Sequence, residues 1–417
     1  RDNTIHGRSW SAGNVFTIDC ATNQLVALTQ VREPKYLAYD SLDNKVYCPF
    51  GPAGAESVLV TRPQVDRRIK SIPLRGAKYA LWDPVSNRLY VSCDMEWNVG
   101  VIDCETDSLI EVIRVGDGPT KMALDSRRRE LYVQLYDEGT VAVIDLRTNT
   151  VARTIRSGLY LFCGLFSPAA NKYYVGMDRE VAVVDAGSDS VVRRIRLSGD
   201  IIALEKNEAQ MLLYAGGNTA TGADSVWTID MRTDAVVAAR HTGGEPWDIH
   251  YSAVTGQAYC LSNRPAQVAV MAGDGGEVRS TLALSEAPYV IAASPQSRRL
   301  YVGHLNSRKV YVVRDSGPDW PRFGEPEPDT GDVAAWPNPF GSSVSCRFAA
   351  AGPGGPVAVY DRAGTLVRTL TASKTGPERA VASWDGRDGA GREAPSGVYF
   401  LVPRFEGAAP ARVVRSR

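Results

Sequence analysis

Residues 130–156 read ELYVQLYDEGTVAVIDLRTNTVARTIR, and the repetition of this stretch decides the fold. It holds three short apolar runs, rich in Val, Ile, Leu and Tyr, separated by the turn-forming pieces YDEG and DLRTN. A Tyr inside such a run recurs at intervals of 43, 42, 42, 40, 45 and 42 residues, at Tyr47, Tyr90, Tyr132, Tyr174, Tyr214, Tyr259 and Tyr301. This period predicts an array of seven similar structural units.

Each unit reads as four strands. An apolar run precedes most of the repeated Tyr residues, as in PKYLAYDSLDN from Pro34 and AKYALWDPVSN from Ala77. A run of the V-x-V-I-D type follows, as at Val141–Asp145, and then a fourth apolar run. Four short strands per unit, repeated around an axis, are typical of a β-propeller. We therefore predict an all-β chain with a seven-bladed β-propeller over residues 1–315.

The ends of the repeat array predict how the ring closes. The chain begins within a unit, with strands of the third and fourth type at 15–19 and 24–31, and the last unit supplies three strands up to Arg314. We expect an N-terminal strand to complete the final blade. One strand is then left over, either 15–19 or 310–314.

The repeated carboxylates do not predict a metal or acid–base array. They open short hairpin loops, where a carboxylate accepts nearby backbone N–H groups, at Asp19, Asp103, Asp145, Asp185 and Asp230. We interpret them as turn caps. The repeated Tyr residues are expected to pack between blades, with each hydroxyl finding a partner near the rim.

The composition changes after the repeats. Residues 316–335 form a predicted linker rich in Pro and acidic residues. Residues 336–417 carry 11 basic and 6 acidic side chains, a net charge of +5, and alternate as short strands with Gly-bearing turns. About 80 residues of this kind predict a small Ig-like β-sandwich. Within it, Trp384 is expected in the core and the acids after it in a tight hairpin.

Residues 15–315 resemble the seven-bladed YVTN repeat proteins, also described as YncE-like or lactonase-like. The likeness rests on the L-Y-V and V-x-V-I-D-x-x-T-N/D pieces and on the Pro-led first strands. The Asn of Y-V-T-N is absent, because the chain has YVSC from Tyr90, YVQL from Tyr132, YVGM from Tyr174 and YVGH from Tyr301. The resemblance is therefore to the superfamily and to no single enzyme within it.

The C-terminal segment resembles the Ig-like domain of flagellar hook-capping proteins. The motifs are NPF from Asn338, VYDRAGTLVRTL from Val359, SWDGRDGAG from Ser383 and PSGVYF from Pro395. The same pattern is similar to the C-terminal sorting domain of many bacterial proteins exported by type IX secretion. This resemblance implies export, with attachment to the cell surface or assembly.

Composition narrows the possible partners. The 47 basic and 47 acidic side chains balance, which gives no general attraction to nucleic acid or anionic lipid. No run approaches the ~20 apolar residues of a membrane-spanning helix. The seven Cys form no C-x-x-C pair, so we expect mostly buried free thiols. Because the sequence starts at Arg1 with no signal peptide before it, we expect a processed or recombinant chain.

Ligand sites are expected at the mouth of the propeller channel, where the innermost strands begin. Alignment of the units on their Tyr places two rows of residues there. The first row is Lys35, Lys78, Thr120, Phe162, Ile202, Trp247 and Tyr289; the second is Tyr36, Tyr79, Lys121, Cys163, Ala203, Asp248 and Val290. One side is cationic (Lys35, Lys78, Lys121) and the other aromatic (Phe162, Trp247, Tyr289), which suits an anionic or sugar-like ligand.

Asp248 and His250 lie two apart on a predicted strand and hence on one face. They are the one Asp/His pair with a hint of acid–base capability, although a contact between blades explains His250 more simply. The sequence shows no nucleophile elbow, no phosphate-binding Gly-rich loop and no clustered metal ligands. We therefore predict no catalytic residue, no metal and no cofactor.

These observations favour a secreted bacterial protein, extracellular or on the cell surface, that acts as a non-catalytic structural or interaction protein. Its expected partners are proteins, including other copies of itself in an oligomer, filament or layer built through the Ig-like module. Two alternatives remain open: a lactonase-like hydrolase, and a carbohydrate- or peptide-binding module, each using the channel mouth. Fold alone does not separate them.

Overall fold

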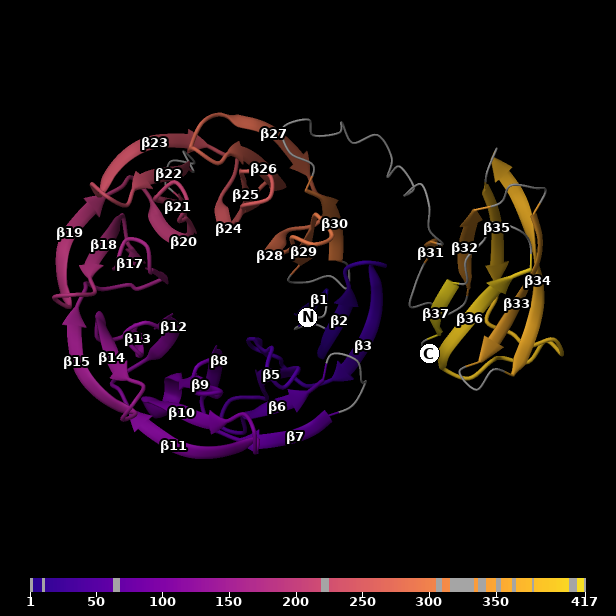
Figure 1. Ribbon diagram of the computed structural model, residues 1–417, viewed down its shortest axis with the longest axis horizontal. Helices are drawn as coiled ribbons and strands as arrows, with labels where there is room; N and C mark the ends of the chain where they lie inside the picture. The colour runs from indigo at the N-terminus through magenta and orange to yellow at the C-terminus, as the bar shows by residue number, and fades with distance from the viewer. Residues whose placement is uncertain are drawn as a thin grey trace. The chain divides into compact units, whose positions relative to one another are not determined.

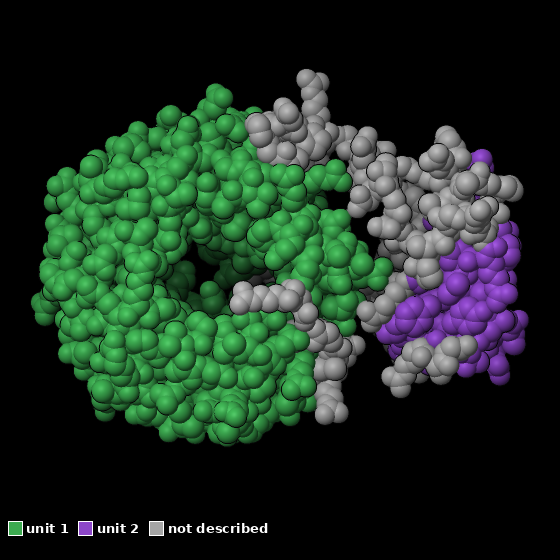
Figure 2. All heavy atoms as spheres, in the orientation of Figure 1, with its two compact units in different colours: residues 1–321 green, residues 322–417 purple. Residues whose placement is uncertain are grey.

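The computed structural model describes residues 3–9, 12–62, 68–218, 225–304, 310–315, 334–336, 343–349, 354–361, 365–376, 379–404 and 411–415. The chain divides into two compact units, Arg1–Pro321 and Arg322–Arg417 (Figures 1 and 2). Apart from one helical turn at Asp94–Glu96, every element in these residues is a β-strand, which confirms the all-β prediction. They contain no helix long and apolar enough to cross a membrane. The predicted linker lies outside them up to residue 333.

Unit 1 is a ring of small antiparallel sheets, each with its first strand toward the centre (Figure 1). Six sheets have four strands: β4–β7 (Ala38–Asp40, Lys45–Phe50, Ser57–Thr61, Arg68–Pro73), β8–β11 (Ala77–Asp83, Arg88–Cys93, Asn98–Asp103, Ser108–Arg114), β12–β15 (Pro119–Asp125, Glu130–Leu135, Thr140–Asp145, Thr150–Arg156), β16–β19 (Cys163–Ser167, Lys172–Met177, Glu180–Asp185, Ser190–Arg196), β20–β23 (Asp200–Asn207, Leu212–Asn218, Ser225–Asp230, Ala235–His241) and β24–β27 (Pro246–Ser252, Gln257–Asn263, Ala266–Ala272, Val278–Ala283). Two have three strands: β28–β30 (Pro288–Ser294, Arg299–His304, Val310–Arg314) and β1–β3 (Thr4–Ser9, Asn14–Asp19, Gln24–Gln30).

Neighbouring sheets cover the middle strands on both faces, which explains their continuous apolar runs. β14 is buried from Thr140 to Ile144, whereas the outermost strand of the same sheet, β15, has exposed residues at alternate positions. Apolar clusters fill the spaces between consecutive sheets. All seven Cys are buried free thiols, as predicted.

The repeated Tyr residues pack between neighbouring sheets, as predicted, but only five of the seven hydroxyls find a hydrogen-bond partner: those of Tyr132 and Tyr174 have none within the described residues. All seven are at most 2% exposed. The Tyr47 hydroxyl donates to Asp107 Oδ1 at 2.7 Å, and the Tyr90 hydroxyl donates to Asn149 Oδ1 at 3.0 Å. Both acceptors lie in the hairpin turn between the third and fourth strands of the following sheet. The period of the sequence thus records one buried position repeated around the ring.

The repeated Asp residues cap turns, as predicted. Each accepts one or more backbone N–H groups of its own hairpin: Asp19 from Ala21 and Thr22, Asp103 from Thr106, Asp145 from Arg147, Asp185 from Gly187 and Ser188, and Asp230 from Arg232 and Thr233. These bonds hold the tight turns that the short strands require.

The N-terminal strands correct the predicted ring closure. The described residues of unit 1 form eight sheets, so the count of seven blades is not confirmed. Neither β2 nor β3 completes the final sheet, because both belong to a separate sheet with β1. The sequence did not predict β1, which pairs with β2 from Thr4↔Asp19 to Ser9↔Asn14. β1 lies beside β28. The segment at 15–19 is therefore the second strand of a sheet of its own.

Hydrogen bonds tie this N-terminal sheet to β28–β30. The Tyr301 hydroxyl donates to Asn23 Oδ1 at 2.9 Å, the same contact that Tyr90 makes with Asn149. Arg299 donates to the Cys20 carbonyl at 2.5 Å, and Asn3 donates to Ser297 at 2.6 Å. The N-terminal sheet therefore packs beside β28–β30 in the same way that each sheet of the ring packs beside its neighbour.

Tyr301→Phe tests this closure. Removal of one neutral hydrogen bond is expected to lower the free energy of unfolding of the ring by about 1 kcal/mol. Tyr90→Phe, which removes the equivalent bond elsewhere in the ring, is the matched control and should cost a similar amount. Urea unfolding measures both. An unchanged midpoint for Tyr301→Phe beside a lowered one for Tyr90→Phe would show that the N-terminal sheet adds nothing to the ring.

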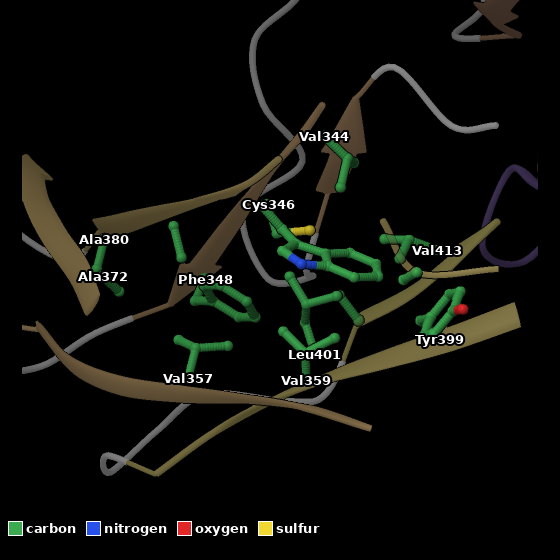
Figure 3. Close-up of a cluster of buried hydrophobic side chains, with 14 residues drawn as sticks. Val344, Cys346, Phe348, Val357, Val359, Ala372, Ala380, Tyr399, Leu401 and Val413 are labelled. Atoms are coloured by element: carbon green, nitrogen blue, oxygen red, sulfur yellow. The ribbon is translucent and has the colours of Figure 1, made fainter. Parts of the chain in front are cut away.

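The seven described strands of unit 2 enclose a core of their own. Their hydrogen-bonded order is β31-β32-β35-β34-β33-β36-β37, and β31 contacts β37, so the two edges of the sheet meet. The strands are β31 (Ala334–Trp336), β32 (Val344–Ala349), β33 (Gly354–Asp361), β34 (Leu366–Gly376), β35 (Arg379–Trp384), β36 (Gly397–Pro403) and β37 (Ala411–Arg415). Figure 3 shows Phe348, Val359, Leu401 and Tyr399 pointing into this core.

Trp384 is a core residue, as predicted. Its side chain is fully buried, and its ring meets Tyr399 edge to face at 4.8 Å between centroids. The indole Nε1–H donates to the Arg387 carbonyl at 2.8 Å. Asp388 accepts backbone N–H groups from Ala390 and Arg392, which confirms the expected acid-capped hairpin.

Candidate functional site

The innermost strands carry an irregularity where they enter the channel. The pairing between first and second strands shifts register between Ala77 and Tyr79, and equivalent shifts occur between Pro119 and Met122, Ile201 and Ala203, Pro246 and Asp248, and Pro288 and Val290. The residues inside these shifts are Lys78, Thr120 with Lys121, Ile202, Trp247 and Tyr289. A bulge re-aims the side chains that it contains. Repeated bulges thus account for the predicted ring of residues.

A cavity of about 230 Å³ lies among these strands. Its lining residues are Tyr36, Tyr79, Ala80, Leu81, Lys121, Met122, Cys163, Gly164, Ile202, Ala203, Leu204, Trp247 and Asp248. They come from six consecutive sheets, and the ring is visibly hollowed at its centre in Figure 2. All of the second predicted row except Val290 lines the cavity, whereas the first row contributes Ile202 and Trp247.

The predicted cationic side is largely neutralised. Lys35 forms an ion pair with Glu56 at 3.2 Å, and Lys78 forms one with Asp94 at 2.8 Å. Neither Lys lines the cavity. Lys121 does line it, and within the described residues its ammonium has no ion-pair or hydrogen-bond partner. Lys121 is therefore the Lys of the cavity lining, and within the described residues it is not neutralised by an ion pair.

Of the predicted aromatic side, Trp247 lines the cavity, whereas Tyr289 does not. Trp247 and Tyr289 pack with ring centroids 5.7 Å apart, and Arg8 lies over Tyr289 at 5.8 Å. Phe162 does not line the cavity. A second pair, Tyr36 and Tyr79, meets edge to face at 5.2 Å between centroids and does line it.

Asp248 supplies the negative charge of the cavity. Its Oδ1 accepts the Ile249 N–H at 3.0 Å, and its Oδ2 accepts the Ile291 N–H at 3.1 Å. Burial raises the pKa of Asp248 to about 6, although the two N–H donors and the charge of Lys121 oppose the shift. Lys121 and Asp248 line the same cavity, and within the described residues they form no ion pair with each other.

The predicted Asp248/His250 pair does not operate as a unit. In the described part of the chain no hydrogen bond joins the two side chains, and His250 does not line the cavity. Burial lowers the pKa of His250, and the charge that opposes this shift is that of Asp315 rather than Asp248. Because His250 lies outside the cavity lining, a structural role between blades explains it better than a catalytic role.

Glu205 on β20 was missed by sequence reasoning. Burial raises its pKa to about 7, and the charge of Asp248 adds to the shift. The sequence held a sign of it, because Glu205 directly follows the apolar residues IIAL on an innermost strand. Cys163, the thiol that lines the cavity, donates to the Ile201 carbonyl at 3.3 Å, and burial raises its pKa to about 12. That thiol therefore stays protonated at neutral pH.

The geometry of unit 2 agrees with a known domain family. Residues 341–402 match the FlgD Ig-like domain. This match confirms the predicted Ig-like fold and its resemblance to hook-capping proteins. The matched residues lie within unit 2, so this match says nothing about the ring of unit 1.

Solved structures support the propeller-like fold of the chain. Kuenenia stuttgartiensis hydrazine synthase is 16% identical with a TM-score of 0.53, covering 67% of this chain and 95% of that one. A chain of the mitotic checkpoint complex is 15% identical with a TM-score of 0.56, covering 67% and 89%. Dihydro-heme d1 dehydrogenase NirN is 13% identical with a TM-score of 0.62, covering 92% and 75%. In a comparison with curated proteins, no match to this chain was found. At these identities the likeness concerns the fold alone.

Proposed function

We propose that the chain is a secreted bacterial protein, extracellular or on the cell surface, that acts without catalysis as an interaction protein. The propeller carries a recognition site in its channel, and the FlgD Ig-like domain provides attachment or self-assembly. Kinship of the propeller with the YVTN repeat proteins, and of the Ig-like domain with sorting domains, belongs to the same proposal and rests on the sequence motifs.

The cavity carries the binding part of this proposal. It combines an unpartnered ammonium, a carboxylate held by two backbone N–H groups, and exposed aromatic rings, Trp247 and Tyr36 being 39% and 44% exposed. Concave sites lined by apolar groups with a few convergent polar ones are typical of ligand binding. The thiol in the lining is protonated, and no His lines the cavity within the described residues, so the groups present are suited to holding a molecule.

One observation favours the rival hydrolase. Asp248 and Glu205 have pKa values raised to about 6 and about 7, and carboxyl groups that titrate near neutrality serve as general acids and bases. A panel of lactones and esters, assayed on the full chain and on Asp248→Asn, separates the two functions. We expect no hydrolysis above that of the variant. Turnover that Asp248→Asn abolishes would replace the binding protein with an enzyme.

The assembly part of the proposal is tested by electron microscopy and light scattering of the full chain over a concentration series. Residues 336–417 carry a net charge of +5, whereas residues 1–335 carry 36 basic and 41 acidic side chains, a net charge of −5, so electrostatic attraction between copies would weaken with salt. Filaments, layers or particles of rising mass are expected. Monodisperse monomers at every concentration would remove self-assembly and leave attachment to another partner.

A further inference from the structure

We infer that the channel cavity binds a small zwitterion with one ammonium and one carboxylate, of the size of an α-amino acid. The inference rests on the proposed binding function and names the ligand class of the same site. It is carried by the placement of Lys121, Asp248 and the aromatic rings around a cavity of limited volume.

Charge is the first argument. Lys121 on β12 has no partner within the described residues, and Asp248 on β24 has backbone N–H donors only. Both side chains line the same cavity, and within the described residues they form no ion pair with each other. A ligand that enters must displace the water around both charges, and a charge that loses water without gaining a partner is costly.

This cost discriminates between ligand classes. A simple anion would pair with Lys121 and leave Asp248 facing a like charge. A simple cation would pair with Asp248 and leave Lys121 facing a like charge. A neutral molecule would remove water from both side chains without giving either an ionic partner. A zwitterion pairs its carboxylate with Lys121 and its ammonium with Asp248, so both groups are satisfied at once.

The rings and the apolar wall fit the same ligand. Trp247 and Tyr36 line the same cavity as Asp248, and aromatic rings in a binding cavity attract an ammonium. The remaining lining includes Met122, Ile202 and Ala203, which suit an aliphatic side chain.

Volume limits the ligand. The cavity has a volume of about 230 Å³, which is room for a small molecule of the size of an amino acid. Leucine and its neighbours in size are of this order, whereas a folded peptide or an oligosaccharide would extend out of the cavity.

Calorimetric titration of the full chain tests the inference. The twenty L-α-amino acids are titrated singly, and leucine is compared with isoamylamine, which lacks the carboxylate, and with 4-methylpentanoate, which lacks the ammonium. We expect at least one amino acid of leucine size or smaller to bind, and each singly charged analogue of it to bind at least tenfold more weakly.

Variants identify the two charges. Lys121→Met should weaken the amino acid at least tenfold and remove its advantage over the amine, and Asp248→Asn should remove its advantage over the carboxylate. Lys78→Met is the matched control, because Lys78 is paired with Asp94 and does not line the cavity, so it should bind as the parent does. Since Asp248 also holds two backbone N–H groups, Lys121→Met carries the test if Asp248→Asn folds poorly.

Two results would overturn the inference. If 4-methylpentanoate or isoamylamine binds as tightly as leucine and depends on Lys121 or Asp248, the site takes singly charged ligands, and the binding function stands without the zwitterion. If none of these compounds binds, the zwitterion is excluded. Failure of the proposed function itself is recognised separately, by hydrolysis in the lactone and ester panel.

Discussion

Glu205→Gln is expected to raise the free energy of unfolding of the propeller by about 2–3 kcal/mol at pH 8 and to leave it unchanged near pH 4. Glu205 lies on the innermost strand β20, and burial raises its pKa from 4.5 to about 7. A neutral amide of nearly the same shape removes the cost of a buried carboxylate.

The sign follows from proton linkage. Between pH 4.5 and pH 7 the folded state keeps the proton of Glu205, whereas the unfolded state has lost it. The unfolded state therefore binds fewer protons, so the stability of the parent falls as the pH rises through this window. The Gln variant has no such proton, and its stability curve should lack this fall.

Urea unfolding at intervals from pH 4 to pH 8 measures the effect. Glu208→Gln is the matched control on the turn that follows the same strand. Although burial opposes it, hydrogen bonds from Lys206 and Ser167 lower the pKa of Glu208, so its replacement should destabilise the protein slightly at neutral pH. Parallel pH curves for the parent and Glu205→Gln would show that Glu205 ionises normally in the channel.

The repeats were predictable because each Tyr is buried between neighbouring sheets at the same position in the repeat. The strand β1 was not, because Thr4–Ser9 reads TIHGRS and lacks both the Tyr and the apolar run. Its place is set by pairing with β2, where the ring of Phe16 occupies the space beside Gly7 that any side chain there would need. Because pairing with β2 determines the position of β1, the residues of β1 alone do not predict a strand there.

The site was predictable in position but not in charge. Alignment of the units found the bulged positions, because the bulge recurs at the same place in five first strands. The ion pairs that neutralise Lys35 and Lys78 come from Glu56 and Asp94, which belong to hairpins that differ from unit to unit. A repeat pattern averages over those residues, so Lys121 could not be singled out before the structure was known.

Trp384→Ala is expected to lower the free energy of unfolding of the Ig-like domain by about 3–5 kcal/mol. The side chain is fully buried, packs against Tyr399 and donates to the Arg387 carbonyl at 2.8 Å, so alanine leaves both a cavity and an unpaired carbonyl. Domains of this size are marginal, and a loss of this magnitude removes most of their stability.

Calorimetry of the full chain should therefore show the transition of the Ig-like domain lost or strongly lowered, with that of the ring retained, because each unit has its own core. Phe400→Ala, on the same domain but 37% exposed, is the control and should cost less than about 1 kcal/mol. If the ring transition falls with the domain, the two units are energetically coupled. If it does not, Trp384→Ala yields a protein that keeps the channel and loses the domain. Such a protein should still bind in the channel while failing to assemble, and this separates the two halves of the proposed function.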